Sequence, residues 1–136
     1  MTDFLNKLFV MVTDTLKGIK ILIVEDDLSS RLYLNKILER AGADLLNAGD
    51  GVEAISVVEN NNDVDIILMD IQLPVMDGYT AAKKIRELRG DIKIIAQTAY
   101  GMSDDMESII ASGFDDYILK PIYAGQLVDK LASFCK

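Results

Sequence analysis

The stretch that decides the fold is DIILMD, at residues 65–70. Its central run, Ile66-Ile67-Leu68-Met69, is apolar at every position, which is typical of a strand covered by helices on both faces. Counting this stretch, short apolar runs bounded by turn residues recur at 20–24, 44–47, 65–69, 93–97 and 116–119. Helix-like periodicity fills the intervals, so strand and helix patterns alternate five times. This alternation predicts an α/β fold with a doubly wound sheet of five parallel strands.

Each predicted helix carries apolar residues at the spacing of one helix face. Gly42 and Gly113 fall where helices should end in a left-handed residue. Asp27 and Ser103 are candidate N-caps. The residues that carry this helical period are Leu32, Ile37, Leu38 and Ala41; Val52, Ile55 and Val58; Ala81, Ile85 and Leu88; Met106, Ile109 and Ile110; and Leu127, Val128 and Leu131.

The composition is that of one globular domain. The chain has 136 residues, of which 50% are hydrophobic and 26% are charged, enough for a single substantial core. Its net charge is −8 and it has no basic run, so neither nucleic acid nor an anionic membrane surface is an expected partner. No window reaches the ~18 uninterrupted apolar residues of a membrane helix, so membrane insertion is not expected either.

Two residue types limit the chemistry. The chain has no histidine, and therefore no imidazole to act as a general base, a metal ligand or a phosphohistidine. Its single cysteine, Cys135, cannot form an internal disulfide, which agrees with a reducing, cytoplasmic location. Any metal must be held by oxygen ligands, which points to a hard cation such as Mg²⁺, Mn²⁺ or Ca²⁺.

Residues 1–17 are predicted to form an amphipathic helix or linker ahead of a domain at 18–136. Thr2 or Asp3 would cap this helix and Gly18 would end it. Two alternatives remain open, since the apolar stripe either packs on the domain or serves as an arm for homodimerisation. The stripe consists of Phe4, Leu8, Met11 or Val12, and Leu16.

Polar residues follow four of the predicted strands. Glu25 and Asp26 follow the first, Asp70 the third, Thr98 the fourth and Lys120 the fifth. Because the carboxyl ends of parallel strands meet at one edge of a sheet, one cleft is expected to hold them all. If the three carboxylates lie within ~4 Å of one another, each pair repels by ~1 to 4 kcal/mol. A divalent cation relieves this repulsion, so the sequence predicts a site for Mg²⁺, with Mn²⁺ as the alternative.

The same cleft suits phosphoryl transfer. No neighbour of Asp70 is placed to deprotonate an alcohol or a water, but a carboxylate can itself attack phosphorus and form an aspartyl phosphate. Lys120 is expected to pair with the phosphoryl oxygens, and Thr98 to donate a hydrogen bond to them. Catalysis of this kind consists of positioning and charge stabilisation. The domain would catalyse its own phosphorylation and slow dephosphorylation, without turnover of an external substrate.

Four motifs together resemble the receiver domain of two-component response regulators. They are ILIVEDD at 21–27, MDIQLPVMDG at 69–78, QTA at 97–99 and KP at 120–121, and the match covers about residues 18 to 136. Each motif is weak by itself, whereas four in order on predicted strand ends are very specific. The resemblance implies a flavodoxin-like (βα)5 receiver fold and a role in signal transduction through a phosphorelay.

The resemblance also implies a role for each residue of the site. Asp70 would be phosphorylated, Asp26 would touch the metal, and Glu25 would act on the metal mainly through water. Gln72 would lend its carbonyl oxygen to Mg²⁺. Lys120 would precede a cis peptide bond to the following proline.

A second set of implied roles concerns the response to phosphorylation. Thr98 and Tyr117 would form a switch that changes the face built from the fourth helix, the fifth strand and the fifth helix, where a downstream protein binds. Gln72 and Tyr100 would set the lifetime of the phosphate. Tyr100 would screen it from water, whereas Gln72 would help to orient the attacking water.

The phosphoryl donor must lie outside this chain, because the chain has no histidine. The resemblance implies a histidine kinase or a histidine phosphotransfer protein, or else a small acyl phosphate. The phrase AQTAY at 96–100 resembles receivers of hybrid histidine kinases, so an excised hybrid-kinase receiver is slightly favoured over a free-standing regulator.

Other functions fit less well. A haloacid-dehalogenase-type phosphatase expects its nucleophile on the first strand, and a flavodoxin-like nucleotide binder needs a glycine-rich loop where this chain has acids. The stronger alternative is a protein-interaction module that keeps the receiver fold without phosphorylation. Gly78 and Gly101 are interpreted as serving loop conformations.

Overall fold

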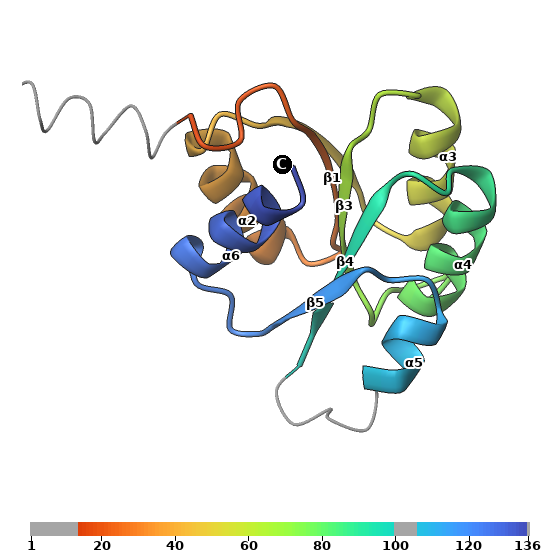
Figure 1. Cartoon of the computed structure of the whole chain (residues 1–136). Helices are drawn as coiled ribbons and strands as arrows, with labels where there is room; N and C mark the ends of the chain where they lie inside the picture. Colours follow the sequence, from red (N-terminus) through yellow and green to blue (C-terminus); the bar gives the residue numbers. More distant parts are fainter. Residues whose placement is uncertain (1–13, 100–105, 136) are drawn as a thin grey trace, which may run out of the picture.

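The computed structural model describes residues 14–99 and 106–135 (Figure 1). Strands and helices alternate along this part of the chain, as the sequence predicts. The strands are β1 (Lys20–Val24), β2 (Asp44–Ala48), β3 (Ile66–Asp70), β4 (Lys93–Thr98) and β5 (Asp116–Leu119). The helices are α2 (Leu28–Arg40), α3 (Gly51–Asn60), α4 (Gly78–Leu88), α5 (Met106–Ala111) and α6 (Ala124–Ser133).

The five strands form one parallel sheet in the order β2-β1-β3-β4-β5. The chain starts near the middle of the sheet, moves outward to β2, and then crosses β1 to build the other half. This is the doubly wound topology that the alternating pattern predicts, and functional groups collect outside the carboxyl ends of its strands. The prediction of fold class is therefore confirmed.

Helices cover both faces of the sheet, with α2 and α6 on one side and α3, α4 and α5 on the other (Figure 1). Alternate residues of each strand contribute to the two cores, because side chains of a strand point to opposite faces in turn. In β3, Ile67 packs in the core under α3 to α5, whereas Leu68 packs in the core under α2 and α6. Both side chains are fully buried, which explains why this strand is apolar without alternation.

Three predicted helix ends agree with the structure. The Asp27 side chain accepts a 2.9 Å hydrogen bond from the Ser30 amide, which caps the start of α2. Gly42 and Gly113 have φ values of 91° and 96°, the left-handed conformation that glycine adopts without strain. The predicted cap Ser103 lies outside the described residues.

Only some of the apolar residues that recur at helical spacing are buried. In α2 the buried residues are Leu34 and Leu38, whereas Leu32 is 60% exposed. Val52 and Ile110 also recur at this spacing, and they are 49% and 57% exposed. These helices carry more apolar residues than one face holds, so spacing alone does not identify the face that meets the sheet.

The start of the described chain forms turns. Residues 14–18 contain no helix, and Gly18 has a φ of 82°. Leu16 is fully buried between α2 and α6, and its amide donates a 2.8 Å hydrogen bond to the Ala41 carbonyl. The rest of the predicted helix, residues 1–13, lies outside the described residues, so that prediction is not confirmed. Within the described segments, no helix has both the length and the apolar character that a membrane span requires.

Arg86, on α4, holds together the two loops that precede β4 and β5. Its guanidinium donates to the Gly113 carbonyl at 2.7 Å, to the Gly90 carbonyl at 2.8 Å and to the Ile92 carbonyl at 2.6 Å. It also pairs with Asp115 at 2.7 Å. One side chain therefore satisfies carbonyl groups of the α4–β4 and α5–β5 loops.

Replacing Arg86 with methionine is expected to lower the free energy of unfolding by about 2 to 3 kcal/mol, since several partly buried acceptors lose their donor at once. Urea denaturation followed by far-UV circular dichroism measures the change. Lys84→Met, an exposed position on the same helix, is the matched control and is expected to be neutral. Equal stability of the two variants would show that these carbonyl groups do not need the guanidinium.

Candidate functional site

Three carboxylates meet at the carboxyl ends of β1 and β3. Glu25 and Asp26 directly follow β1, and Asp70 is the last residue of β3. Each side chain offers an oxygen, and these oxygens lie within 4.8 Å of one another. Glu25 and Asp70 are buried, whereas Asp26 is exposed. The predicted acidic cleft is therefore present in the structure.

Both oxygens of the Asp70 carboxylate have a partner. The Lys120 ammonium, just beyond β5, donates to Oδ2 at 2.8 Å, and the Gln72 amide donates to Oδ1 at 2.9 Å. These contacts orient the carboxylate at the sheet edge. They also stabilise its negative charge, because hydrogen bonds that involve ionised groups are the stronger ones.

Glu25 lies in an environment that disfavours the ionised form of its carboxyl group. Its Oε2 accepts a 3.3 Å hydrogen bond from the Asp27 amide, but its buried Oε1 has no hydrogen-bond partner within the described part of the chain. The nearest cation is the Lys120 Nζ, 3.7 Å from Oε1, which is too far for a hydrogen bond. Burial, with the charge of Asp70 adding to it, raises the pKa of Glu25 to about 7.

Lys120 is held in place from several sides. Its amide donates a 2.8 Å hydrogen bond to the Thr98 carbonyl, and the bond that it forms with Pro121 is cis, as predicted. The Tyr33 hydroxyl donates to the Ile122 carbonyl at 2.7 Å and so ties this loop to α2. Burial by itself would lower the pKa of Lys120, but the hydrogen bond and charge of Asp70 outweigh burial and raise it.

The two predicted switch residues lie on neighbouring strands. Thr98 ends β4 and is buried, and Tyr117, in β5, is half-buried. Tyr117 pairs with Ala96 in the sheet register, two residues before Thr98, so both side chains project to the face covered by α4 and α5. The Lys130 ammonium lies 5.6 Å from the centroid of the Tyr117 ring. Tyr100, the predicted screen of the phosphate, lies outside the described residues.

The role of Gly78 differs from the prediction. It is the first residue of α4, with no positive φ, so it does not serve a loop conformation. A Cβ atom here would lie 2.5 Å from the Asp70 carbonyl oxygen and 2.8 Å from the Ile71 Cα, both backbone atoms. Gly78 is needed because the start of α4 passes against the backbone of the site. Sequence reasoning missed this because a close approach between segments leaves no mark on spacing. The second glycine so interpreted, Gly101, lies outside the described residues.

The cluster fits a hard divalent cation. Three carboxylates share a small space with one lysine, and the buried Oε1 of Glu25 has no hydrogen-bond donor among the described residues. An ion with a preference for oxygen would supply the missing positive charge. Glu25, Asp26 and Asp70 are the side chains that the structure offers for it.

Comparison with other proteins gives three informative relatives. The chain is 38% identical over 138 residues to probable histidine kinase 2 of Oryza sativa subsp. indica, covering 89% of this chain and 13% of that protein. It is 38% identical over 111 residues to hybrid signal transduction histidine kinase I of Dictyostelium discoideum, covering 76% of this chain and 6% of the kinase. An uncharacterized 14.6 kDa protein of Leptolyngbya boryana is 34% identical over 123 residues, covering 89% of this chain and 93% of that protein. The chain thus spans only a small part of the two kinases.

Solved structures with the same fold include two with informative partners. One is the co-crystal structure of the Saccharomyces cerevisiae histidine phosphotransfer protein Ypd1 with the receiver domain of Ssk1. It has a TM-score of 0.82 and 29% identity, and the match covers 88% of this chain and 90% of that chain. Another is the receiver domain of a Pseudomonas aeruginosa sensor histidine kinase with a magnesium ion in its active-site cleft, with a TM-score of 0.79, 34% identity and coverage of 86% and 97%.

The match to a protein family covers most of the described domain. Residues 21–132 match the response regulator receiver domain, a region that contains the acidic cluster and all five strands except Lys20, the first residue of β1. The sheet order, the three carboxylates and the relatives in two-component signalling agree with this match. The chain belongs to the response regulator receiver domain family.

Proposed function

We propose that this domain accepts a phosphoryl group on Asp70 and changes its binding surface in response. The observation that carries the proposal is the arrangement around Asp70. Its carboxylate accepts hydrogen bonds from the Lys120 ammonium and the Gln72 amide and lies beside two further acids, Glu25 and Asp26. A structural aspartate needs no such cluster of like charges, which costs stability unless a cation or substrate uses it.

The reaction proposed is a direct displacement at phosphorus. An Asp70 oxygen forms the new bond to phosphorus as the bond to the donor breaks. The donor is a phosphohistidine, whose ring takes up a proton from solvent and leaves as neutral imidazole with the electron pair of the broken N–P bond, or a small acyl phosphate, whose acyl group leaves as a carboxylate. No base in this chain is required, because the attacking carboxylate is already ionised.

The other residues of the site act on the charge of the transferred group. The Lys120 ammonium moves from the carboxylate to the phosphoryl oxygens, and the Thr98 hydroxyl donates a hydrogen bond to them. Mg²⁺, or Mn²⁺ in its place, held by Glu25, Asp26, Asp70 and the Gln72 carbonyl, would supply charge neutralisation for the incoming phosphoryl group. The phosphate would then decay slowly, with Gln72 orienting the attacking water and Tyr100 limiting its access.

The response is proposed to pass from Thr98 to Tyr117. Both side chains project to the same face of the sheet on adjacent strands, so movement of Thr98 toward the phosphate opens space for the Tyr117 ring. This rearrangement would change the surface formed by α5, β5 and α6, where we place the downstream partner.

A histidine kinase or a histidine phosphotransfer protein is the proposed donor. The yeast complex of Ypd1 with a receiver domain and the identity with plant and amoebal kinases support this choice. The same relatives favour a hybrid-kinase receiver over a free-standing regulator. The single cysteine, Cys135, is free, which agrees with a reducing compartment, so we infer that this domain acts in the cytoplasm.

The test is phosphorylation by acetyl phosphate followed by intact-mass spectrometry. With Mg²⁺ we expect the mass of one added phosphoryl group, and with excess EDTA we expect none. Asp26→Asn should slow the reaction by about tenfold or more, while Glu59→Gln, an exposed acid on α3, should not. If the chain gains no mass in Mg²⁺, the phosphorylation-independent interaction module becomes the better account.

A further inference from the structure

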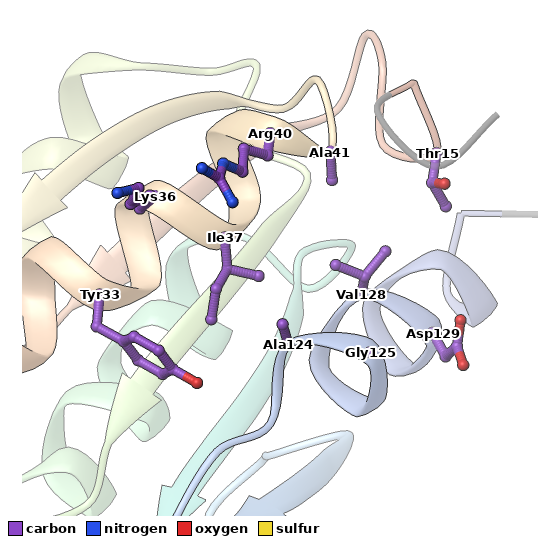
Figure 2. Close-up of a pocket in the computed structure, with 10 residues that line it drawn as sticks. All are labelled: Thr15, Tyr33, Lys36, Ile37, Arg40, Ala41, Ala124, Gly125, Val128 and Asp129. Atoms are coloured by element: carbon purple, nitrogen blue, oxygen red, sulfur yellow. The ribbon is translucent and has the colours of Figure 1, made fainter. Parts of the chain in front are cut away.

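A groove of about 820 Å³ runs between α2 and α6, on the opposite side of the sheet from α3 to α5 (Figure 2). One wall comes from Tyr33, Ile37 and the long side chains of Lys36 and Arg40, and the other from Ala124 and Val128. Figure 2 shows Ile37 and Val128 directed toward the space between the helices. The groove therefore has an apolar floor that no part of the described chain covers.

The N-terminal end of the described chain lies at one end of this groove. Thr15 is one of its lining residues (Figure 2), and Leu16 is fully buried between the same two helices. The Leu16 amide is tied to the Ala41 carbonyl, at the end of α2. The polypeptide that precedes Asp14 therefore begins beside the groove, so its effective concentration there is high.

The preceding segment has the composition of a buried element. Eight of residues 1–13 are apolar, and the only charged side chains are those of Asp3 and Lys7. Phe4, Leu8 and Met11 recur at helical spacing, so one face of such a helix is apolar. In helical form thirteen residues span roughly 20 Å, which equals the length of the 13-residue α2 that forms one wall.

We propose that residues 1–13 of the same chain occupy the α2–α6 groove. A second copy of the chain is the less suitable occupant, because each copy carries a net charge of −8 and two copies repel. The N-terminal segment brings one acidic and one basic side chain, and its apolar face matches Ile37 and Val128. The segment would then cover the apolar floor of the groove and be joined to the buried Leu16 through Asp14 and Thr15.

Hydrogen–deuterium exchange of the full chain tests this inference. Backbone amides within residues 4–12 are expected to exchange about tenfold or more slowly than in an unstructured peptide of the same sequence. Ala124→Arg, which places a charged side chain in the groove from an exposed position, is expected to remove this protection. Gln126→Arg, exposed on the same helix but not lining the groove, is the matched control and should retain it.

A second variant leaves the groove intact. Leu8→Ser removes an apolar side chain from the segment and should also abolish the protection, whereas Val10→Ser, off the stripe, should not. Equal exchange in wild type, Ala124→Arg and Gln126→Arg would overturn the proposal. Protection that rises with protein concentration, together with a dimeric mass in analytical ultracentrifugation, would overturn it in favour of an arm bound to a second copy.

Discussion

Asp70→Asn is expected to abolish phosphoryl acceptance and to leave the domain folded. Asparagine keeps the shape and one oxygen, which can still accept from the Gln72 amide, but its amide nitrogen cannot accept from the Lys120 ammonium and it lacks the ionised oxygen that attacks phosphorus. Loss of one of three clustered carboxylates also removes like-charge repulsion. In EDTA the free energy of unfolding should therefore stay within about 1 kcal/mol of the wild-type value, because the lost repulsion offsets the lost ion pair with the partly exposed Lys120.

Two measurements separate chemistry from folding in this variant. Intact mass after treatment with acetyl phosphate and Mg²⁺ reports acceptance, and urea denaturation in EDTA reports stability. Asp63→Asn is the control, since Asp63 is exposed, pairs with Lys20 at 2.6 Å and precedes the start of β3, whereas Asp70 lies at the other end of that strand. A phosphoryl group found on the Asp70→Asn protein would show that another residue accepts it.

Gly78→Ala is expected to destabilise the domain by about 3 kcal/mol or more, because the added methyl group overlaps the backbone. The new Cβ would lie 2.5 Å from the Asp70 carbonyl oxygen. Relief requires movement of α4 away from the end of β3, which also breaks the 2.9 Å hydrogen bond from the Gly78 amide to the Ile71 carbonyl. Since this movement displaces the Asp70 peptide, phosphoryl acceptance should fall with stability.

Gly90→Ala is the matched control for this substitution. An added Cβ at Gly90 has no neighbour within 4 Å, and its φ is not positive. We expect this variant to be neutral or more stable by about 0.5 kcal/mol, because alanine restricts the unfolded chain. Urea denaturation compares the two. If Gly78→Ala matched Gly90→Ala in stability, the backbone at the start of α4 would have to yield far more easily than the structure indicates.

The elements that sequence reasoning located correctly share a local cause. A run such as Ile66 to Met69 identifies its strand because burial on both faces requires apolar residues throughout. Asp27, Gly42 and Gly113 mark helix ends because capping depends on the conformation and hydrogen bonds of adjacent residues. Such signals lie within a few positions of the structure that they specify.

Sequence reasoning was insufficient where several elements compete for one surface. Leu32 and Leu34 are both apolar residues of α2, yet only Leu34 faces the sheet. Arg86 appears from sequence to be an ordinary helix residue, although it binds the Gly113 carbonyl 27 positions away. Residues 14–17, the described part of the predicted N-terminal helix, form turns instead.

The sequence by itself determined the alternation of strands and helices, the parallel sheet and the identity of the acids at its edge, since each follows from periodicity or from residue order. Only the tertiary structure decided how those acids interact. The register of β1, β3 and β5 leaves Glu25 Oε1 buried without a hydrogen-bond donor in the described chain and places Lys120 on Asp70. Burial and charge then raise the pKa of Glu25 to about 7. These interactions depend on distances between segments that are far apart in the sequence, and neither periodicity nor the order of motifs specifies those distances.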